Sequence, residues 1–257
     1  MQDSESGEQL TSVGIIGCGA IGTLIAEAVE KKIVLCDRLI LCDIDRSKAE
    51  KLKGRLRTPV VVTKDVEEMI RLRPAVIIEA ASQQAAREYT KKIIAENVEL
   101  IVMSVGALLD MGIRSDKIHI SSGAIGGLDA ISSANLAGVE EVVLTTRKNP
   151  GVLDLADQQE KLIYEGDAQT AARRFPREMN VAATLALTVE PEKVRVRIIS
   201  DPRVHRNVHE ITVKWKYGQM FLQFSNDPHP ENPKTSALSA WSAIRLLKQI
   251  LDNRGSA

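Results

Sequence analysis

The sequence predicts an α/β protein: an N-terminal doubly wound parallel sheet, then a smaller α+β domain with a mixed or antiparallel sheet. Three observations lead to this fold class. The apolar run at residues 13–16 passes directly into Gly17, Gly19 and Gly22 and then into an alanine- and leucine-rich stretch, the order of a strand, a tight turn and a helix. Short apolar runs then alternate with helical patterns up to residue 120, which is typical of βαβ units. After Gly138 apolar and polar residues alternate instead, as in strands with one covered face.

The composition is typical of a globular protein. Of the 257 residues 44% are hydrophobic, enough for a sizeable core. Lys+Arg and Asp+Glu both number 34, which argues against a nucleic-acid partner because phosphate binding requires a basic excess. No apolar run reaches the roughly 18–20 residues that span a bilayer, and the polar first 12 residues differ from a signal peptide. We therefore expect a cytoplasmic protein without a membrane partner. Cys18, Cys36 and Cys42 lack metal-ligand spacing, so no metal is expected.

The glycines form the fingerprint G-x-G-x-x-G of a Rossmann dinucleotide site. Gly17 allows the tight turn, Gly19 lets the backbone approach a pyrophosphate, and Gly22 lets the helix pack against the strand. The first helical residues, Ala20 and Ile21, offer N–H groups without intrahelical partners, which suits an anion.

An acidic residue follows the second apolar run, at the place where the fingerprint expects it. Asp43 ends the run 39–42, 21 residues after Gly22. Such a carboxylate accepts hydrogen bonds from the adenosine ribose; the alternative is a solvated turn aspartate. Asp45 disfavours the 2′-phosphate of NADP, whereas Arg46 could pair with it. NAD is the expected cofactor, and NADP stays possible.

The other elements of the first domain follow from the same alternation. Because ligands bind outside the carboxyl ends of parallel strands, the strand exits at Ala81, Ser82, Ser104 and Val105 should join the glycine turn in one crevice. Expected strands cover 39–42, 60–62, 75–82 (with its exit), 99–103 and 118–120, and expected helices cover 20–32, 47–53, 64–72 and 84–97.

A glycine-rich loop, residues 121–129, forms the expected hinge into the second domain. There we expect helices at 128–136, 168–175 and 177–189, strands at 139–147, 193–199, 206–216 and 219–224, and a proline-containing loop at 226–234. A last helix, capped by Thr235 or Ser236 and running to about Asn253, carries an apolar stripe and should return to the first domain. The predicted divisions are 1–123 for dinucleotide binding, 124–232 for substrate and dimerisation, and 233–257 for this helix.

Three later stretches, together with the glycine fingerprint, resemble the L-aspartate dehydrogenase family. They are residues 122–129 (SGAIGGLD), 180–185 (NVAATL) and 207–211 (NVHEI). The resemblance implies that Ala124 and Asn180 lie against an NAD(P) cofactor and that His209 is catalytic. It also implies a homodimer that oxidises L-aspartate to iminoaspartate, which hydrolyses to oxaloacetate and ammonia or feeds NAD biosynthesis.

The chemistry of this reaction requires a proton acceptor and cations. An imidazole titrates near neutrality and suits proton transfer, but His209 shares its strand face with Ile211 and Val213, so a hydrogen-bonded core histidine is the alternative. The small-molecule substrate, L-aspartate or iminoaspartate, carries two carboxylates, for which basic side chains are the natural partners. The candidates are Arg173, Arg174, Arg177, Arg203, Arg206 and Lys214.

Two other functions remain open at this point. One is a different two-domain reductase, such as a homoserine dehydrogenase or a dihydrodipicolinate reductase, although the paired-histidine motif of the latter is missing. The other is a non-catalytic dinucleotide sensor, which would keep the glycine turn and Asp43 without needing a histidine in the crevice.

Overall fold

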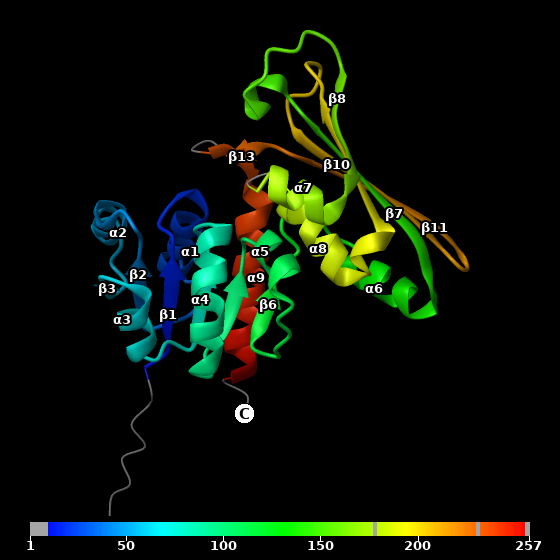
Figure 1. Cartoon of the computed structure of the whole chain (residues 1–257). Helices are drawn as coiled ribbons and strands as arrows, with labels where there is room; N and C mark the ends of the chain where they lie inside the picture. The colour runs from blue at the N-terminus through cyan, green and yellow to red at the C-terminus, as the bar shows by residue number, and fades with distance from the viewer. Residues whose placement is uncertain (1–9, 177–178, 230–231, 255–257) are drawn as a thin grey trace, which may run out of the picture.

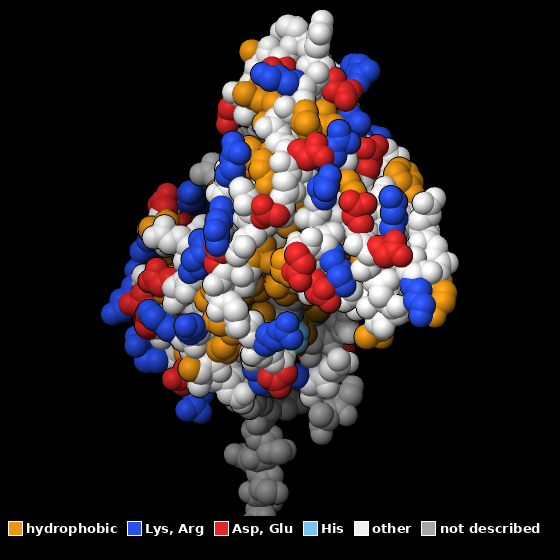
Figure 2. Space-filling model, turned by 45° about the vertical axis from the view of Figure 1, so that its right-hand side comes forward, with side chains coloured by type: hydrophobic (Ala, Val, Ile, Leu, Met, Phe, Trp, Pro, Cys, Tyr) orange, Lys and Arg blue, Asp and Glu red, His pale blue; other side chains and the backbone are white. Residues whose placement is uncertain are grey.

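The computed structural model describes residues 10–176, 179–229 and 232–254; for residues 228–229 and 232–235 only the backbone is described. It confirms the predicted fold class: a parallel sheet with helices on both faces, joined to an α+β domain built on a second sheet (Figure 1). Within the described residues no helix is both long and apolar enough to cross a bilayer. On the face shown in Figure 2, Lys and Arg side chains are interspersed with Asp and Glu.

The first sheet has the strand order β3-β2-β1-β4-β5-β6, and every printed pairing in it is parallel. The order reverses direction between β1 and β4, which is where a doubly wound sheet leaves a crevice for a ligand. The strands are β1 (Ser12–Ile16), β2 (Arg38–Cys42), β3 (Val60–Val62), β4 (Val76–Glu79), β5 (Glu99–Val102) and β6 (Ile118–Ile120).

Helices cover both faces of this sheet because its strands are apolar on both sides. Alternate strand residues enter two separate cores: Val13 and Ile15 pack towards α1, whereas Ile16 and Ile40 pack towards α3 and α4. The helices are α1 (Ala20–Glu30), α2 (Arg46–Lys53), α3 (Val66–Arg71), α4 (Gln83–Ala95) and α5 (Gly106–Met111). The strand exit expected after β5 contains the start of α5, which begins at Gly106.

The second sheet is mixed, with the order β11-β10-β7-β9-β8. β7 pairs in parallel with β9, and the other neighbours are antiparallel. Three helices, α6 (Leu128–Ala137), α7 (Ala168–Arg174) and α8 (Asn180–Thr188), share a buried core with one face of the sheet. The strands are β7 (Val139–Lys148), β8 (Lys161–Asp167), β9 (Val194–Ser200), β10 (Asn207–Trp215) and β11 (Gly218–Asn226); short 3₁₀ helices lie at Pro150–Leu153 and Pro191–Lys193.

Two expectations for the second domain need correction. β8 was not predicted, because its sequence KLIYEGD lacks a regular alternation of apolar and polar residues. The expected loop at 226–234 contains β12 (Pro228–His229), which pairs with β13 (Asn232–Ser236). The sequence predicts a loop there because prolines are unfavourable in strands. The start of the helix expected at 177–189 lies outside the described residues, and α8 begins at Asn180.

The last helix, α9 (Ala237–Arg254), returns to the first domain. Figure 1 shows it beside the first sheet. Its buried residues Ala243, Ile244 and Leu247 enter the core that contains Val13 and Ile15. The chain therefore crosses between the domains twice, and the Gly123 N–H of one crossing donates to the Ser242 hydroxyl of α9 at 3.0 Å. The exact domain limits stay predictions.

Candidate active site

The glycine turn has the geometry that each of its glycines requires. Gly17 has φ +95°, a left-handed conformation, and a Cβ there would lie 2.7 Å from the Ala80 carbonyl oxygen. A Cβ on Gly22 would lie 2.0 Å from the Gly17 oxygen. These two glycines hold the start of α1 against the ends of β1 and β4.

Space for a pyrophosphate lies at Gly19, the N-cap of α1. Among the described residues no atom lies within 4 Å of where its Cβ would be, and no side chain caps the helix. The first N–H groups of α1, at Ala20 and Ile21, lie beside this space at the positive end of the helix dipole. The residues present thus fit the anionic centre of a dinucleotide.

Asp43, which follows β2, ties the second strand to the glycine turn. Its carboxylate accepts the Cys18 N–H at 2.7 Å and the Asp45 N–H at 2.9 Å, and lone pairs remain for ribose hydroxyls. Arg46 is paired with Glu50 at 3.3 Å. Burial raises the pKa of the Cys18 thiol to about 12, so it stays protonated and acts as a small filler of the turn.

A buried carboxylate that the sequence did not single out organises the neighbouring loops. Glu79, at the end of β4, is 1% exposed. It accepts the N–H groups of Ala81 and Ser82 at 2.9 Å, and the N–H and hydroxyl of Ser104 at 3.0 Å. Burial raises the pKa of this carboxyl against the opposing effect of these hydrogen bonds. Glu79 thereby fixes both strand exits beside the crevice.

A pocket of about 80 Å³ lies where this crevice meets the second domain. It gathers expected site residues that are far apart in the sequence: Ile21, Val105, Ala124, Asn180 and His209. The other predicted cofactor residues lie at or beside the strand exits and do not line this pocket. They are Gly17, Gly19, Ala20, Gly22, Asp43, Ala81, Ser82 and Ser104. The remaining lining residues are Met103, Ser121, Gly123, Lys148, Val181, Thr184, Asn207, Ser236 and Ser239.

Hydrogen bonds hold Asn180 and Ala124 in this wall. The Asn180 side-chain oxygen accepts the Gly106 N–H at 3.2 Å, which joins α8 to α5 across the domains. The Ala124 carbonyl accepts the Asn226 side-chain N–H at 3.0 Å. Both residues are therefore fixed by contacts between segments that are distant in the chain.

His209 lies on the inner face of β10 and is 3% exposed. Its Nδ1 is 3.0 Å from the Thr146 hydroxyl on β7. Burial, and secondly the positive charge of Lys148, lower the pKa of His209 from 6.5 to about 3. The imidazole is therefore neutral near pH 7 and can accept a proton.

Lys148 is the site residue that the sequence analysis missed. It ends β7, is 2% exposed, and lines the pocket with His209. The signal lay in the alternation of β7: the inward residues Val142 and Leu144 are apolar, whereas Thr146 and Lys148 are polar. Only the pairing of β7 with β10 reveals that this polar end meets His209.

None of the described basic residues proposed from the sequence lines this pocket. Arg173 binds Asp110 at 2.7 Å, Arg203 binds Asp201, and Arg206 binds Asp227. Arg174 lies over the rings of Tyr164 and Phe175, and Lys214 pairs with Glu141. The Arg177 candidate lies outside the described residues.

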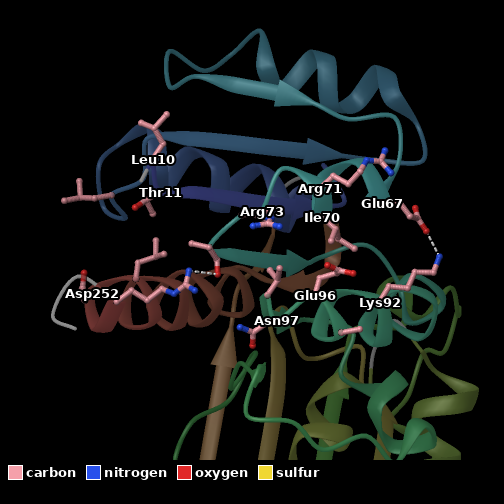
Figure 3. Close-up of a pocket in the computed structure, with 17 residues that line it drawn as sticks. Leu10, Thr11, Glu67, Ile70, Arg71, Arg73, Lys92, Glu96, Asn97 and Asp252 are labelled. Atoms are coloured by element: carbon pink, nitrogen blue, oxygen red, sulfur yellow. Dashed lines mark hydrogen bonds and ion pairs between the residues drawn. The ribbon is translucent and has the colours of Figure 1, made fainter. Parts of the chain in front are cut away.

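A larger hollow of about 1470 Å³ lies at the opposite, amino ends of the strands (Figure 3). It is open and polar, and two of its basic side chains are engaged: Lys92 pairs with Glu67, and Arg254 donates to the Ala75 carbonyl. Ligands of doubly wound sheets bind at the carboxyl ends. The small pocket beside the glycine turn is therefore the better candidate.

The glycine turn lies where the strand order of the doubly wound sheet reverses, and a histidine of the second domain lines the adjoining pocket. These features define an NAD(P)-dependent oxidoreductase. Family models match both parts: residues 17–119 match the NAD-binding domain of homoserine dehydrogenase, and residues 129–250 match the C-terminal part of aspartate dehydrogenase. The chain belongs to the L-aspartate dehydrogenase family.

Relatives match over almost the whole chain. The L-aspartate dehydrogenases of Methanosarcina acetivorans and Methanothermobacter thermautotrophicus are 38% and 39% identical, covering 95% of this chain and 98% and 97% of their own lengths. The crystal structure of aspartate dehydrogenase from Thermotoga maritima has a TM-score of 0.75 at 27% identity, covering 94% of this chain and 97% of that one. A myo-inositol dehydrogenase from Lactobacillus casei, with a TM-score of 0.54 at 11% identity, shares the fold alone.

Proposed function

We propose that this protein oxidises L-aspartate to iminoaspartate, which hydrolyses to oxaloacetate and ammonia, with NAD as the hydride acceptor. The observation that carries the proposal is the placement of His209: a buried, neutral imidazole in the pocket that adjoins the glycine turn. A sensor would need no such group there, and family membership favours aspartate over homoserine.

The chain's own residues are arranged to hold the dinucleotide along the strand exits. The turn from Gly17 to Gly22, with the N–H groups of Ala20 and Ile21, would hold the pyrophosphate, and Asp43 the adenosine ribose. The loops at Ala81, Ser82, Ser104 and Val105 would continue this wall, and Ala124 and Asn180 would contact the nicotinamide end. When bound, the nicotinamide supplies the acceptor for the Cα hydride.

His209 would act as the proton acceptor. Hydride departs readily only when the substrate amine is neutral, so its ammonium must first lose a proton. The Nε2 atom takes this proton if Nδ1–H donates to the Thr146 hydroxyl, 3.0 Å away. Burial favours the neutral imidazole before binding, and the carboxylates of the substrate would raise the pKa of His209 on binding.

The acidic surroundings of the adenosine end favour NAD over NADP. Asp43 and Asp45 would repel a 2′-phosphate, and Arg46, the nearby cation, is engaged with Glu50 at 3.3 Å. Service in NAD biosynthesis and a cytoplasmic location stay predictions of the sequence.

We also propose a homodimer through the outer face of the second sheet. In the described part of the chain, helices cover only the inner face (Figure 1). On the outer face Val143, Thr212 and Phe221 lie side by side on β7, β10 and β11. Phe221 is 67% exposed, and the ion pairs Arg147–Glu210 and Lys214–Glu141 flank this row.

The proposed reaction is tested by following NADH formation at 340 nm with L-aspartate, L-homoserine, L-glutamate and L-alanine, with either NAD or NADP. We expect L-aspartate with NAD to give the highest kcat/KM. Oxidation of homoserine in preference to aspartate would indicate the other reductase. Cofactor binding without turnover of any amino acid would indicate a sensor.

A further inference from the structure

We infer that Lys148 is the cation that receives a carboxylate of the substrate and thereby makes the site selective for a dicarboxylic amino acid. This inference rests on the proposed function and deepens it. It concerns a residue that lines the pocket from the second domain, in a position where the sequence pattern showed only the end of a strand.

The position of Lys148 is set by the pairing of β7 with β10. Thr146 is in register with His209, and Lys148, two residues further along β7, lies on the same face because side chains alternate along a strand. Asn207, two residues before His209 on β10, also lines the pocket. The two strands thus end in a group of four polar side chains next to the crevice.

The charge of the pocket suits an anion. No Asp or Glu occurs among the described residues that line it, and Lys148 is the lysine among them. The side chain is 2% exposed, so its charge acts through a medium of low polarity, in which an anion is attracted more strongly than in water. Lys148 and His209 line the same pocket from neighbouring strands, so the two groups lie close together.

The other basic side chains proposed for this task lie elsewhere in the described structure. Arg173, Arg203 and Arg206 are bound to carboxylates outside the pocket. Among these candidates and the described lining of the pocket, Lys148 is therefore the side chain placed to pair with a substrate carboxylate.

The test compares the wild-type protein with Lys148→Gln and Lys148→Arg. Three quantities are measured: the KM and kcat for L-aspartate at saturating NAD, the inhibition constant of L-malate, a dicarboxylate without an amine, and the dissociation constant of NADH from its fluorescence. Lys161→Gln is the matched control, because Lys161 lies in the same domain with its side chain 63% exposed. Thermal unfolding checks that each variant is folded, and Lys148→Met replaces Lys148→Gln if that variant is not.

We expect Lys148→Gln to raise the KM for aspartate and the inhibition constant of malate by about 30-fold or more, since a buried charge-assisted contact is lost. NADH binding should change less than about twofold, and Lys148→Arg should recover part of the loss because it keeps the charge. Lys161→Gln should match the wild type.

Two outcomes would overturn the inference. One is an unchanged KM and malate inhibition in Lys148→Gln; the other is a loss of NADH binding as large as the loss of malate binding, which would indicate a structural role. If instead the wild-type protein does not oxidise aspartate at all, the proposed function itself fails. The two failures are therefore distinguishable.

Discussion

At the scale of single residues, His209 and Lys148 line one buried pocket, and Lys148 contributes to the lowered pKa of His209. Exposed fractions of 3% and 2% mean that neither side chain is well hydrated. Burial and the nearby ammonium both disfavour the imidazolium, so the pKa of His209 falls to about 3. The ligand-free protein therefore keeps this histidine neutral over the whole range in which a free imidazole titrates.

This shift predicts a loss of stability in acid. The unfolded chain takes up a proton at His209 below about pH 6.5, whereas the folded protein does so only near pH 3. The contribution of the neutral His209 to the free energy of unfolding is therefore complete above pH 6.5. It is lost as the pH falls from 6.5 to 3, by up to about 1.4 kcal/mol per pH unit. His209→Gln lacks this contribution.

Urea unfolding of the ligand-free wild type and of His209→Gln at pH 7.5 and pH 5 measures it. Between these two values the wild type should lose about 2 kcal/mol more of its free energy of unfolding than the variant does. An equal loss in both proteins would show that His209 is protonated in the folded state at pH 5.

The residues that sequence reasoning identified are those with a local pattern. Gly17 and Gly22 follow an apolar run at fixed spacing, and each has the tight backbone contacts that the fingerprint requires. Glu79 and Lys148 have no such spacing. Their roles arise from burial and from strand pairing, so neither could be recognised before the chain was folded.

At the scale of elements, the six strands of the first sheet were predictable because each is a short apolar run between helical patterns. Elements whose sequence lacks such a pattern were not. α5 begins within a strand exit, the sequence of β8 has no regular alternation of apolar and polar residues, and β12 and β13 lie among prolines. For such segments the neighbouring chain determines the conformation more than local propensity does.

The proposed dimer is a prediction about the outer surface of β7, β10 and β11. Phe221→Glu places a charge on the edge strand β11, at the end of the row that Phe221 forms with Thr212 and Val143. A charge buried in an interface without a partner costs several kcal/mol, so the variant should be a monomer at micromolar concentration.

Sedimentation velocity distinguishes the outcomes. The wild type should sediment as a dimer and Phe221→Glu as a monomer, while Leu136→Glu, at an exposed position of α6 on the other side of the sheet, should stay a dimer. A wild-type monomer, or a Phe221→Glu dimer, would contradict this interface.

At the scale of the whole molecule, the candidate site depends on contacts between the domains. The Gln83 side chain on α4 donates to the carbonyls of Ala172 and Pro176 at 3.4 and 3.3 Å. Asp110 on α5 binds Arg173 on α7 at 2.7 Å. These contacts hold the second domain over the strand exits, so that His209 faces the glycine turn from the opposite wall.

This assembly explains which part of the function could be inferred from sequence. The dinucleotide crevice follows from the local pattern between residues 13 and 43. The opposite wall comes from α8, β7, β10 and the start of α9, whose relative placement no local pattern encodes. Ala124, Asn180 and His209 could be named in advance only through family resemblance, and Lys148 lay outside that resemblance.

The central claim is that hydride leaves Cα of L-aspartate in this pocket while His209 accepts the proton. The most direct measurement follows L-aspartate deuterated at C2 with NAD, and uses mass spectrometry to detect deuterium in the NADH formed. The wild type should transfer the label to NADH. His209→Gln should do so at least about 100-fold more slowly, as expected for the loss of a general base, with NADH binding unchanged. Unlabelled NADH from the wild type, or equal rates in both proteins, would contradict the claim.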